Sequence, residues 1–128
     1  MRASQPDSAG DQPSPDLSRR ARGRWGEDRA ASHYRRLGYT VLDRNWRSPS
    51  GELDLVVERD GIVVFSEVKT RRDDRYGPAA AAVGPSKQRR IRLLAVEWLG
   101  AHRRPRDGIR FDVVAITGVR VDVIESAF

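Results

Sequence analysis

Two β-rich segments joined by an Asp-Gly pair constrain the fold of this chain more than any other feature. Residues 52–58 and 62–69 are rich in β-branched and aromatic side chains, and they flank Asp60-Gly61. An Asp-Gly pair in this position is a strong signal for a two-residue hairpin turn. The turn pairs Arg59 with Ile62 and sets the register of the whole hairpin. The chain is therefore expected to contain an antiparallel sheet.

The predicted register brings four charged side chains to one face of the hairpin. Asp54 faces Glu67 and Glu52 faces Lys69, and residues two apart in a strand share a face. Like charges directly opposite one another destabilise a sheet, so the two carboxylates need a compensating charge. A divalent cation with a preference for oxygen ligands, such as Mg²⁺ or Mn²⁺, would supply it. The alternative is an exposed sheet end that Lys69 and neighbouring arginines neutralise.

The remainder of the chain predicts helices on both sides of this hairpin in the sequence. The expected elements are a helix over about 24–37, a strand over 39–45, a helix from a cap at Ser86 to about 100–103, and strands over 109–116 and 119–124. The order α-β-β-β-α-β-β predicts an α/β fold with a mixed sheet and helices packed on it. Residues 1–22, rich in Pro, Ser and Asp, predict a disordered tail before a single domain over 23–128.

The spacing of apolar residues indicates which helix faces meet the sheet. The inward stripe of the first helix is Ala30, Ala31, Tyr34 and Leu37, and that of the second is Ile91, Leu94, Ala95, Trp98 and Leu99. Glu27 continues the first stripe and could join a metal site, although an acid there also suits the helix dipole. Lys87 and Gln88 continue the second stripe, either as phosphate donors at the helix N-terminus or as solvated side chains. Trp25 and Trp98 are both expected in the core.

Charge and composition narrow the function classes. The chain has 128 residues, with 24 Lys and Arg against 18 Asp and Glu, and its net charge of +6 favours a polyanionic partner, with nucleic acid first. Only Lys69 and Lys87 are lysines, which suggests positions that require a compact ammonium group. The absence of cysteine excludes disulfides and thiolate metal sites and fits a cytoplasmic protein. No apolar run is long enough to span a membrane.

Ordered motifs in the chain resemble a known superfamily. Gly26-Glu27, Gly51-Glu52-Leu53-Asp54 and Phe65-Ser66-Glu67-Val68-Lys69-Thr70-Arg71 resemble the PD-(D/E)xK nucleases. The chain is most similar to the YraN-type predicted endonucleases, which are similar to archaeal Holliday-junction resolvases. Further matches are Asn45-Trp46-Arg47, Tyr76-Gly77 and Arg110-Phe111-Asp112-Val113-Val114. The resemblance covers about residues 23–116 and implies a restriction-endonuclease-like αβββαβ core.

The resemblance also implies a reaction and a set of residues for it. The reaction is metal-dependent hydrolysis of phosphodiester bonds in nucleic acid, with Mg²⁺ as the cofactor and Mn²⁺ able to substitute. Glu27, Asp54, Glu67 and the backbone carbonyl of Val68 would hold the metal, and Lys69 would position or activate the attacking water. The supporting residues would be Glu52, Lys87 and Gln88.

Basic residues near these motifs are the candidate contacts to a nucleic acid. The candidates are Arg71, Arg72, Arg75, Arg89 and Arg90, together with Trp46 as a stacking residue. Trp46 could instead be a semi-buried loop anchor. Structured or branched DNA is expected ahead of RNA, and resolvase relatives act as dimers, so a homodimer is open here. The alternative function is a nucleic-acid-binding module that keeps this fold without cleaving.

Overall fold

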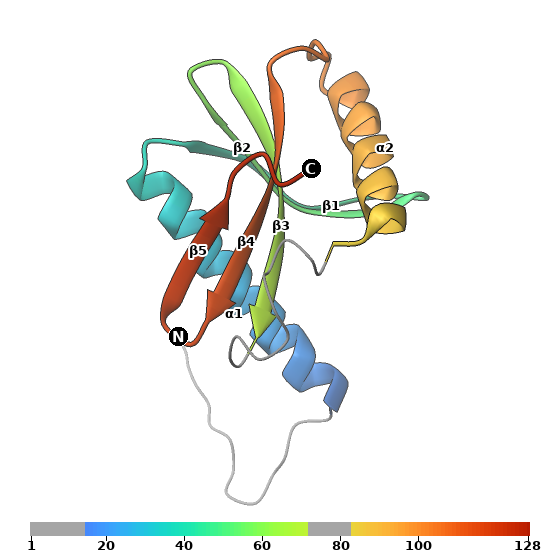
Figure 1. The fold of residues 1–128 in the computed structure, drawn as a ribbon. Helices are drawn as coiled ribbons and strands as arrows, with labels where there is room; N and C mark the ends of the chain where they lie inside the picture. The colour runs from blue at the N-terminus through green and yellow to red at the C-terminus, as the bar shows by residue number, and fades with distance from the viewer. Residues whose placement is uncertain (1–14, 72–82) are drawn as a thin grey trace, which may run out of the picture.

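A computed structural model of the chain describes residues 15–71 and 83–128, which form a five-stranded sheet between two helices. The elements are α1 (Pro15–Arg36), β1 (Thr40–Ser48), β2 (Gly51–Arg59), β3 (Ile62–Arg71), α2 (Pro85–Ala101), β4 (Ile109–Thr117) and β5 (Arg120–Ile124). The strands lie in the order β1-β2-β3-β4-β5, with β3 and β4 parallel and the other neighbours antiparallel. The predicted restriction-endonuclease-like α/β core with a mixed central sheet is confirmed (Figure 1).

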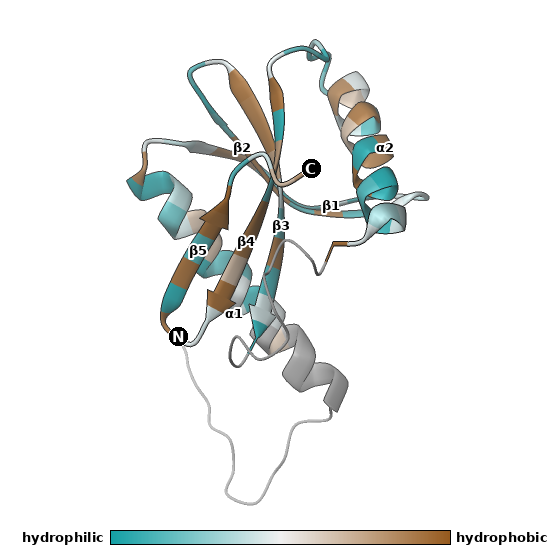
Figure 2. Ribbon diagram, in the orientation of Figure 1, coloured by the Kyte–Doolittle hydropathy of each residue, from teal (hydrophilic) through white to brown (hydrophobic). Residues whose placement is uncertain are grey.

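Each helix covers one face of the sheet and forms its own hydrophobic cluster. The α1 cluster contains Ala30, Ala31, Tyr34, Leu55, Val57, Val64, Val114 and Ile116, among others. The α2 cluster contains Val56, Phe65, Ile91, Leu94, Trp98, Phe111 and Val113, among others. Because the central strands are buried on both faces, apolar residues run along them without a strict alternation (Figure 2). In the described part of the chain, neither helix is long and apolar enough to cross a membrane.

The hairpin between β2 and β3 follows the predicted register along its apolar half. Its ladder runs from the pair Arg59 and Ile62 to the pair Leu55 and Ser66. Asp60-Gly61 has positive φ at both residues, 53° and 80°, as a type I′ turn requires. The turn and the alternation of apolar side chains are both local signals, which is why the sequence predicts this register correctly.

The charged half of the hairpin differs from the prediction. Direct backbone pairing of Asp54 with Glu67, and of Glu52 with Lys69, is wrong, because the ladder ends at Leu55. The backbone N–H of Val68 instead donates to Asp54 Oδ2 at 2.9 Å. A short acidic side chain thus replaces a ladder carbonyl as the acceptor. The carboxylate of Asp54 is thereby held against β3 even though the two backbones no longer pair.

Both helices begin earlier than the sequence pattern predicts. Helix α1 starts at Pro15, so residues 15–22 are helical, and only residues 1–14 of the predicted tail lie outside the described part. Helix α2 starts at Pro85 with Gly84 as its N-cap, so the prediction of Ser86 as the cap is wrong. Proline favours the first helical position because its missing N–H has no partner there in any case. In both helices, the proline rather than a polar cap marks the start.

Two residues predicted to face inward are exposed. Leu37 is 47% exposed because it lies one residue beyond the end of α1, where the helical stripe no longer applies. Trp25 is 44% exposed, and the guanidinium of Arg29 lies over its ring at 5.1 Å. By contrast, Trp98 is buried in the α2 cluster, as predicted.

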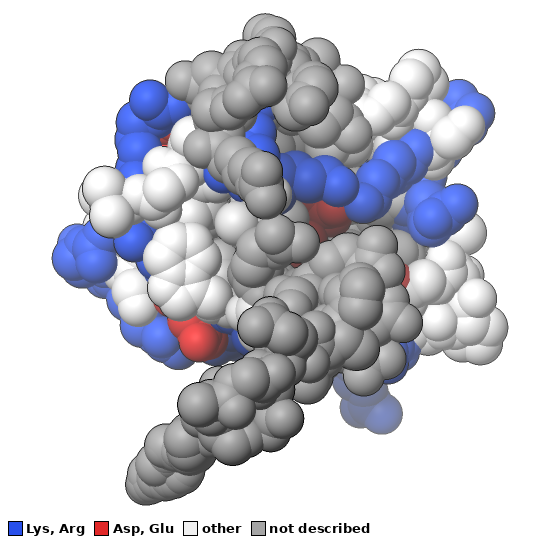
Figure 3. Space-filling model, turned by 90° about the horizontal axis from the view of Figure 1, so that it is seen from below, with Lys and Arg blue, Asp and Glu red and all other residues white. Residues whose placement is uncertain are grey.

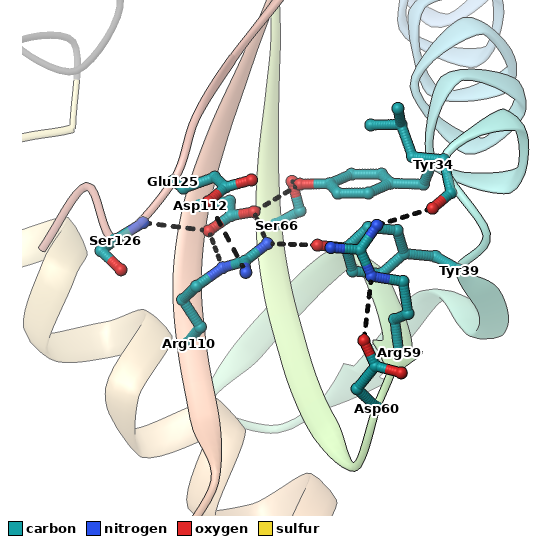
Figure 4. Close-up of polar contacts among 10 residues, drawn as sticks. Tyr34, Tyr39, Arg59, Asp60, Ser66, Arg110, Asp112, Glu125 and Ser126 are labelled. Atoms are coloured by element: carbon teal, nitrogen blue, oxygen red, sulfur yellow. Dashed lines mark hydrogen bonds and ion pairs between the residues drawn. The ribbon is translucent and has the colours of Figure 1, made fainter.

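A buried polar group ties α1 to the sheet (Figure 4). We call Tyr34, Ser66, Arg110, Asp112 and Ser126 the Asp112 network. Asp112 is 0% exposed and accepts hydrogen bonds from the Tyr34 hydroxyl at 2.8 Å, from Arg110 Nε at 2.8 Å and from the Ser126 N–H at 3.1 Å. The Tyr34 hydroxyl also contacts Ser66 Oγ at 3.0 Å. Burial, reinforced by the charge of Asp112, raises the pKa of Tyr34, so this hydroxyl keeps its proton.

Candidate functional site

A pocket of about 200 Å³ opens between the β2–β3 hairpin and the first turns of α2. Its lining is Gly51, Glu52, Asp54, Glu67, Lys87, Arg90, Ile91 and Leu94, and we call it the acidic pocket. Carboxylate side chains lie at the centre of the face in Figure 3, bordered by Lys and Arg side chains. The fold thus brings three predicted carboxylates and one predicted lysine to one place, from two strands and a helix.

The pair Asp54 and Glu67 lies in this pocket. Glu67 is only 6% exposed, Asp54 is partly buried, and both side chains line the same pocket. Burial, followed by the negative charge of Glu67, raises the pKa of Asp54 to about 8. Two neighbouring acids, one buried and one partly buried, repel each other when both are ionised, so their joint ionisation requires a cation to offset that repulsion. The pocket therefore holds either a proton or a positive charge.

Two lysines supply positive charge to Glu67. Lys87 Nζ lies 2.5 Å from Glu67 Oε2, and Lys69 Nζ lies 3.7 Å from the same oxygen. Partial burial disfavours the Lys87 ammonium, but its hydrogen bond to Glu67 and the charge of Glu67 outweigh that cost and raise the pKa of Lys87. The two lysines of this arginine-rich chain therefore meet at one carboxylate.

Glu27 approaches the site from α1 without lining the pocket. Helix α1 approaches β3 so closely here that a side chain at Gly26 would clash with Thr70 Oγ1. Glycine at position 26 therefore permits the close packing. Burial raises the pKa of Glu27, and the interaction with the Asn45 side chain partly opposes that rise. The charge of Glu27 also contributes to the raised pKa of Asp54. Among the causes that raise the pKa of Asp54, the charge of Glu27 is the smallest, and the role of Glu27 as a metal ligand stays a prediction.

Asn45 is a site residue to which the sequence pattern assigned no role. It has a positive φ of 53°, a conformation that asparagine tolerates better than most residues. From strand β1, the interaction of its side-chain amide with Glu27 lowers the pKa of that carboxyl and so partly offsets the effect of burial. The sequence does signal this residue, because Asn45-Trp46-Arg47 is one of the motifs that carry the family resemblance.

Of the remaining predicted site residues, Glu52 lines the pocket, whereas Val68 and Gln88 do not. The N–H of Val68 is used by Asp54. Gln88 Nε2 donates to the Val83 carbonyl at 2.9 Å, so its amide is engaged with the segment before α2, and Gln88 does not line the pocket. Glu52 lines the pocket and has Arg47 Nε 3.6 Å from its Oε2.

The pocket contains the types of donor group that bind a divalent metal, but the described side chains are not grouped closely enough to hold one. Among residues 15–71 and 83–128, no three His, Cys, Asp or Glu side chains lie close enough together to hold a metal. The carboxylates of Asp54 and Glu67 are hard oxygen donors of the kind Mg²⁺ and Mn²⁺ prefer. Lys87, however, already contacts Glu67. A metal ion bound here would replace that ammonium as the compensating charge.

The predicted nucleic-acid contacts are distributed unevenly. Arg90 lines the pocket, and its side chain lies so close to Gly51 that any larger residue at position 51 would press on it. Arg89 is exposed and donates to Ser86 Oγ at 3.3 Å. Arg71 ends β3, whereas Arg72 and Arg75 lie outside the described residues.

Trp46 lies on strand β1 rather than in a loop. It is partly buried against the α2 cluster, with its ring centroid 6.4 Å from that of His102. This packing favours the anchoring alternative over base stacking.

A clamp that the sequence did not reveal joins the β1–β2 turn to α2. Ser48 Oγ and Ser50 Oγ donate to the two oxygens of Glu97 at 2.6 and 2.7 Å. These hydrogen bonds lower the pKa of Glu97, Ser48 contributing most. The turn leads directly into Gly51 and Glu52, so the clamp fixes one wall of the acidic pocket relative to α2.

The fold and this pocket define a class: restriction-endonuclease-like α/β proteins with acidic and lysine side chains on adjacent strands of the sheet. The chain belongs to the uncharacterised protein family UPF0102, whose profile matches residues 26–116. This is the predicted nuclease type that the sequence motifs resemble. The matched range contains Glu27, Asp54, Glu67 and Lys69.

Individual relatives support the same assignment. A UPF0102 protein of Frankia casuarinae is 51% identical over 113 residues, which are 84% of this chain and 96% of that protein. A UPF0102 protein of Rhodococcus opacus is 55% identical over 96 residues, covering 75% of this chain and 81% of that protein. A UPF0102 protein of Syntrophotalea carbinolica is 52% identical over 95 residues, covering 73% and 76%.

Proposed function

We propose that this protein is a metal-dependent endonuclease that hydrolyses phosphodiester bonds in nucleic acid, with structured or branched DNA ahead of RNA. The observation that carries the proposal is the contact between Asp54 and Glu67 in a pocket that also holds Lys87, with Lys69 beside it. Such a pair costs stability, and perturbed acids in a pocket are characteristic of functional sites. Membership of UPF0102 and the net charge of +6 support the same reading.

The proposed metal ligands are Glu27, Asp54, Glu67 and the Val68 carbonyl. A bound Mg²⁺ or Mn²⁺ would polarise a phosphate oxygen and lower the pKa of a water molecule for in-line attack. Lys69, 3.7 Å from Glu67 Oε2, is placed to orient that water or to stabilise negative charge on the phosphate. Lys87 and Arg90, at the start of α2, would bind the phosphate with help from the helix N-terminus.

A specific observation also favours a second function, a nucleic-acid-binding module that does not cleave. Lys87 Nζ contacts Glu67 Oε2 at 2.5 Å, which gives the acidic pair a permanent cation without any metal. A binding module would use the arginines for salt-dependent, sequence-independent affinity. It would gain nothing, however, from carboxylates that face a phosphate. For this reason we place cleavage first.

The test compares wild type with Glu67→Ala, and Glu125→Ala serves as the control because Glu125 is an exposed acid outside the pocket. Highly purified proteins are incubated with branched, flapped, single-stranded and duplex DNA and with RNA, in Mg²⁺, Mn²⁺ or EDTA. Wild type and Glu125→Ala should cut with metal and not in EDTA. Glu67→Ala should lose about 10³-fold or more in rate, since one carboxylate ligand is removed. Asp54→Asn and Lys69→Ala should also abolish cleavage while folding and nucleic-acid binding persist.

Two outcomes would contradict the nuclease proposal. Equal cleavage by wild type and Glu67→Ala would assign the activity to a contaminant or to another site. Absence of cleavage on every substrate, together with nucleic-acid binding that neither EDTA nor the substitution changes, would favour the binding module.

A further inference from the structure

Strand β5 ends the sheet with an open edge. It pairs with β4 from Val113 and Ile124 to Thr117 and Arg120, and no other described strand pairs with it. Figure 1 shows β5 at the margin of the sheet, away from α2. The pair Thr117 and Arg120 flanks a two-residue turn, so it is a hydrogen-bonded pair of the ladder. The alternation of the ladder then turns the backbone groups of Val121 outward.

The side chains along this edge alternate between charged and apolar. Arg120 Nε and Asp122 Oδ2 form an exposed ion pair at 2.8 Å on one face. On the other face Val121 and Val123 pack partly against the α1 cluster. Val119, in the turn before β5, is 84% exposed and is the most exposed of the large apolar side chains described. Among the described residues, no hydrogen bond engages the outward backbone groups of Val121, whereas the Val119 carbonyl accepts one from Arg29 Nη2. The edge therefore offers the backbone groups of Val121, opposite charges two residues apart, and the exposed side chain of Val119.

We propose that β5 pairs antiparallel with β5 of a second copy of this chain, about a two-fold axis through Val121. In this register the outward backbone groups of Val121 bond the second copy's Val121. Arg120 of each copy then lies directly opposite the second copy's Asp122, so the ion pair within each strand extends into an array of four alternating charges. Val119 comes next to the second copy's Val123. The two five-stranded sheets become one continuous sheet.

Backbone hydrogen bonding and charge together exclude the neighbouring registers of this β5–β5 pairing. A slip of one residue would turn backbone groups that are already bonded to β4 toward the second copy. The two slips that keep the outward groups in place put Arg120 opposite the second copy's Arg120, or Asp122 opposite the second copy's Asp122. Like charges directly opposite one another across strands are destabilising. One register therefore satisfies both the backbone and the side chains.

The opposite edge of the sheet explains why assembly would end at two copies. Strand β1 has a register shift between Val41 and Asp43 and a positive φ at Asn45. Such irregularities make an edge strand a poor template for pairing. With only one regular edge in each copy, the contact is isologous and closed. Strand β5 also lies beyond residues 26–116, so this contact is independent of the proposed nuclease site.

Sedimentation equilibrium of the full chain over a range of concentrations tests the proposal. We expect a reversible monomer–dimer equilibrium for the wild type. Arg120→Asp alone would face carboxylates with carboxylates, and Asp122→Arg alone would face cations with cations. Each single variant should weaken dimerisation by about tenfold or more. Asp107→Arg makes the same charge change as Asp122→Arg, but at an exposed loop residue, and it should leave dimerisation unchanged.

The decisive arm mixes the two single variants. In the mixture each Asp at position 120 meets an Arg at position 122, and each Asp at position 122 meets an Arg at position 120, so a heterodimer should form although neither variant dimerises well alone. Far-UV circular dichroism shows beforehand that both variants are folded. A monomeric wild type at every concentration would overturn the proposal. A dimer that neither variant weakens, or folded variants that fail to associate on mixing, would also overturn it.

Discussion

The Asp112 network and the acidic pocket place buried carboxylates on the same sheet in opposite electrostatic situations. Asp112 is surrounded by donors, including both a guanidinium and a hydroxyl, and Arg110 binds its two oxygens at 2.8 and 2.9 Å. Asp54 has one backbone donor, and the charge that most raises its pKa is that of another acid, Glu67. The fold thus satisfies the buried Asp112 fully and leaves the partly buried Asp54 dependent on a cation.

The difference separates stability from function within one sheet. The hydrogen bonds that Arg110 donates to Asp112, together with the attraction of the Asp112 charge, raise the pKa of Arg110, so this guanidinium stays ionised. In the pocket, the compensating cation is Lys87, whose flexible side chain reaches Glu67 from another element. An arrangement that tolerates exchange of its cation is what a metal-binding or phosphate-binding site requires. The Asp112 network, in which every charge already has a partner, serves to hold α1 rigidly against the sheet.

Replacing Asp112 is expected to produce the largest change in stability. Asp112→Asn keeps the shape of the side chain but leaves Arg110 without its buried counter-charge. Breaking such a buried pair costs about 3 kcal/mol of unfolding free energy. Urea unfolding measures the loss. Asp28→Asn, which touches only the exposed ion pair with Arg44, should cost less than about 1 kcal/mol. Equal losses of unfolding free energy in the two variants would show that the Asp112 network contributes no more to stability than an exposed ion pair does.

The same substitution in the acidic pocket should act in the opposite direction. Asp54→Asn removes a charge that burial and Glu67 both disfavour, and the amide oxygen can still accept from the Val68 N–H. Without metal, in EDTA at mildly alkaline pH, we expect the variant to be more stable than wild type by about 1 kcal/mol. Urea unfolding measures this difference, and Mg²⁺ should stabilise wild type and not the variant. A destabilised variant in EDTA would mean that the ionised Asp54 is fully compensated after all.

The contrast also explains what the sequence could predict. The register from Arg59 to Leu55 follows from a two-residue turn and from alternating side chains, both of which are local. The convergence of Asp54 and Glu67 follows from that register, although by a side-chain hydrogen bond rather than by direct pairing. The position of Lys87 follows from helical spacing. Local periodicity therefore accounts for most of the pocket.

The features that the sequence did not reveal depend on long-range contacts. The clamp joins Glu97 to Ser48 and Ser50, which lie 49 and 47 positions earlier in the chain, and no local rule connects residues so far apart. The Asp112 network gathers side chains from α1, β3 and β4, and its only local sign is an acid within the apolar run Ile109–Ile116. The exposure of Trp25 reflects where α1 crosses the sheet, which its apolar spacing does not determine. Burial of polar groups and exposure of apolar ones are both set by tertiary packing.

The smallest effect in this comparison is expected at a partly exposed ion pair, Arg104 with Glu58. Arg104 binds both oxygens of Glu58, at 2.6 and 3.2 Å, and this hydrogen bonding lowers the pKa of Glu58. A folded-state pKa below the unfolded value stabilises the protein above the ordinary pKa, and that contribution is lost as pH falls through the lowered one. Glu58→Gln should therefore cost less than about 1 kcal/mol at neutral pH and nothing in strong acid. Urea unfolding at both pH values measures the difference. A cost that persists in acid would assign the contribution of Glu58 to packing, and only the buried pair at Asp112 would then owe its stability to charge.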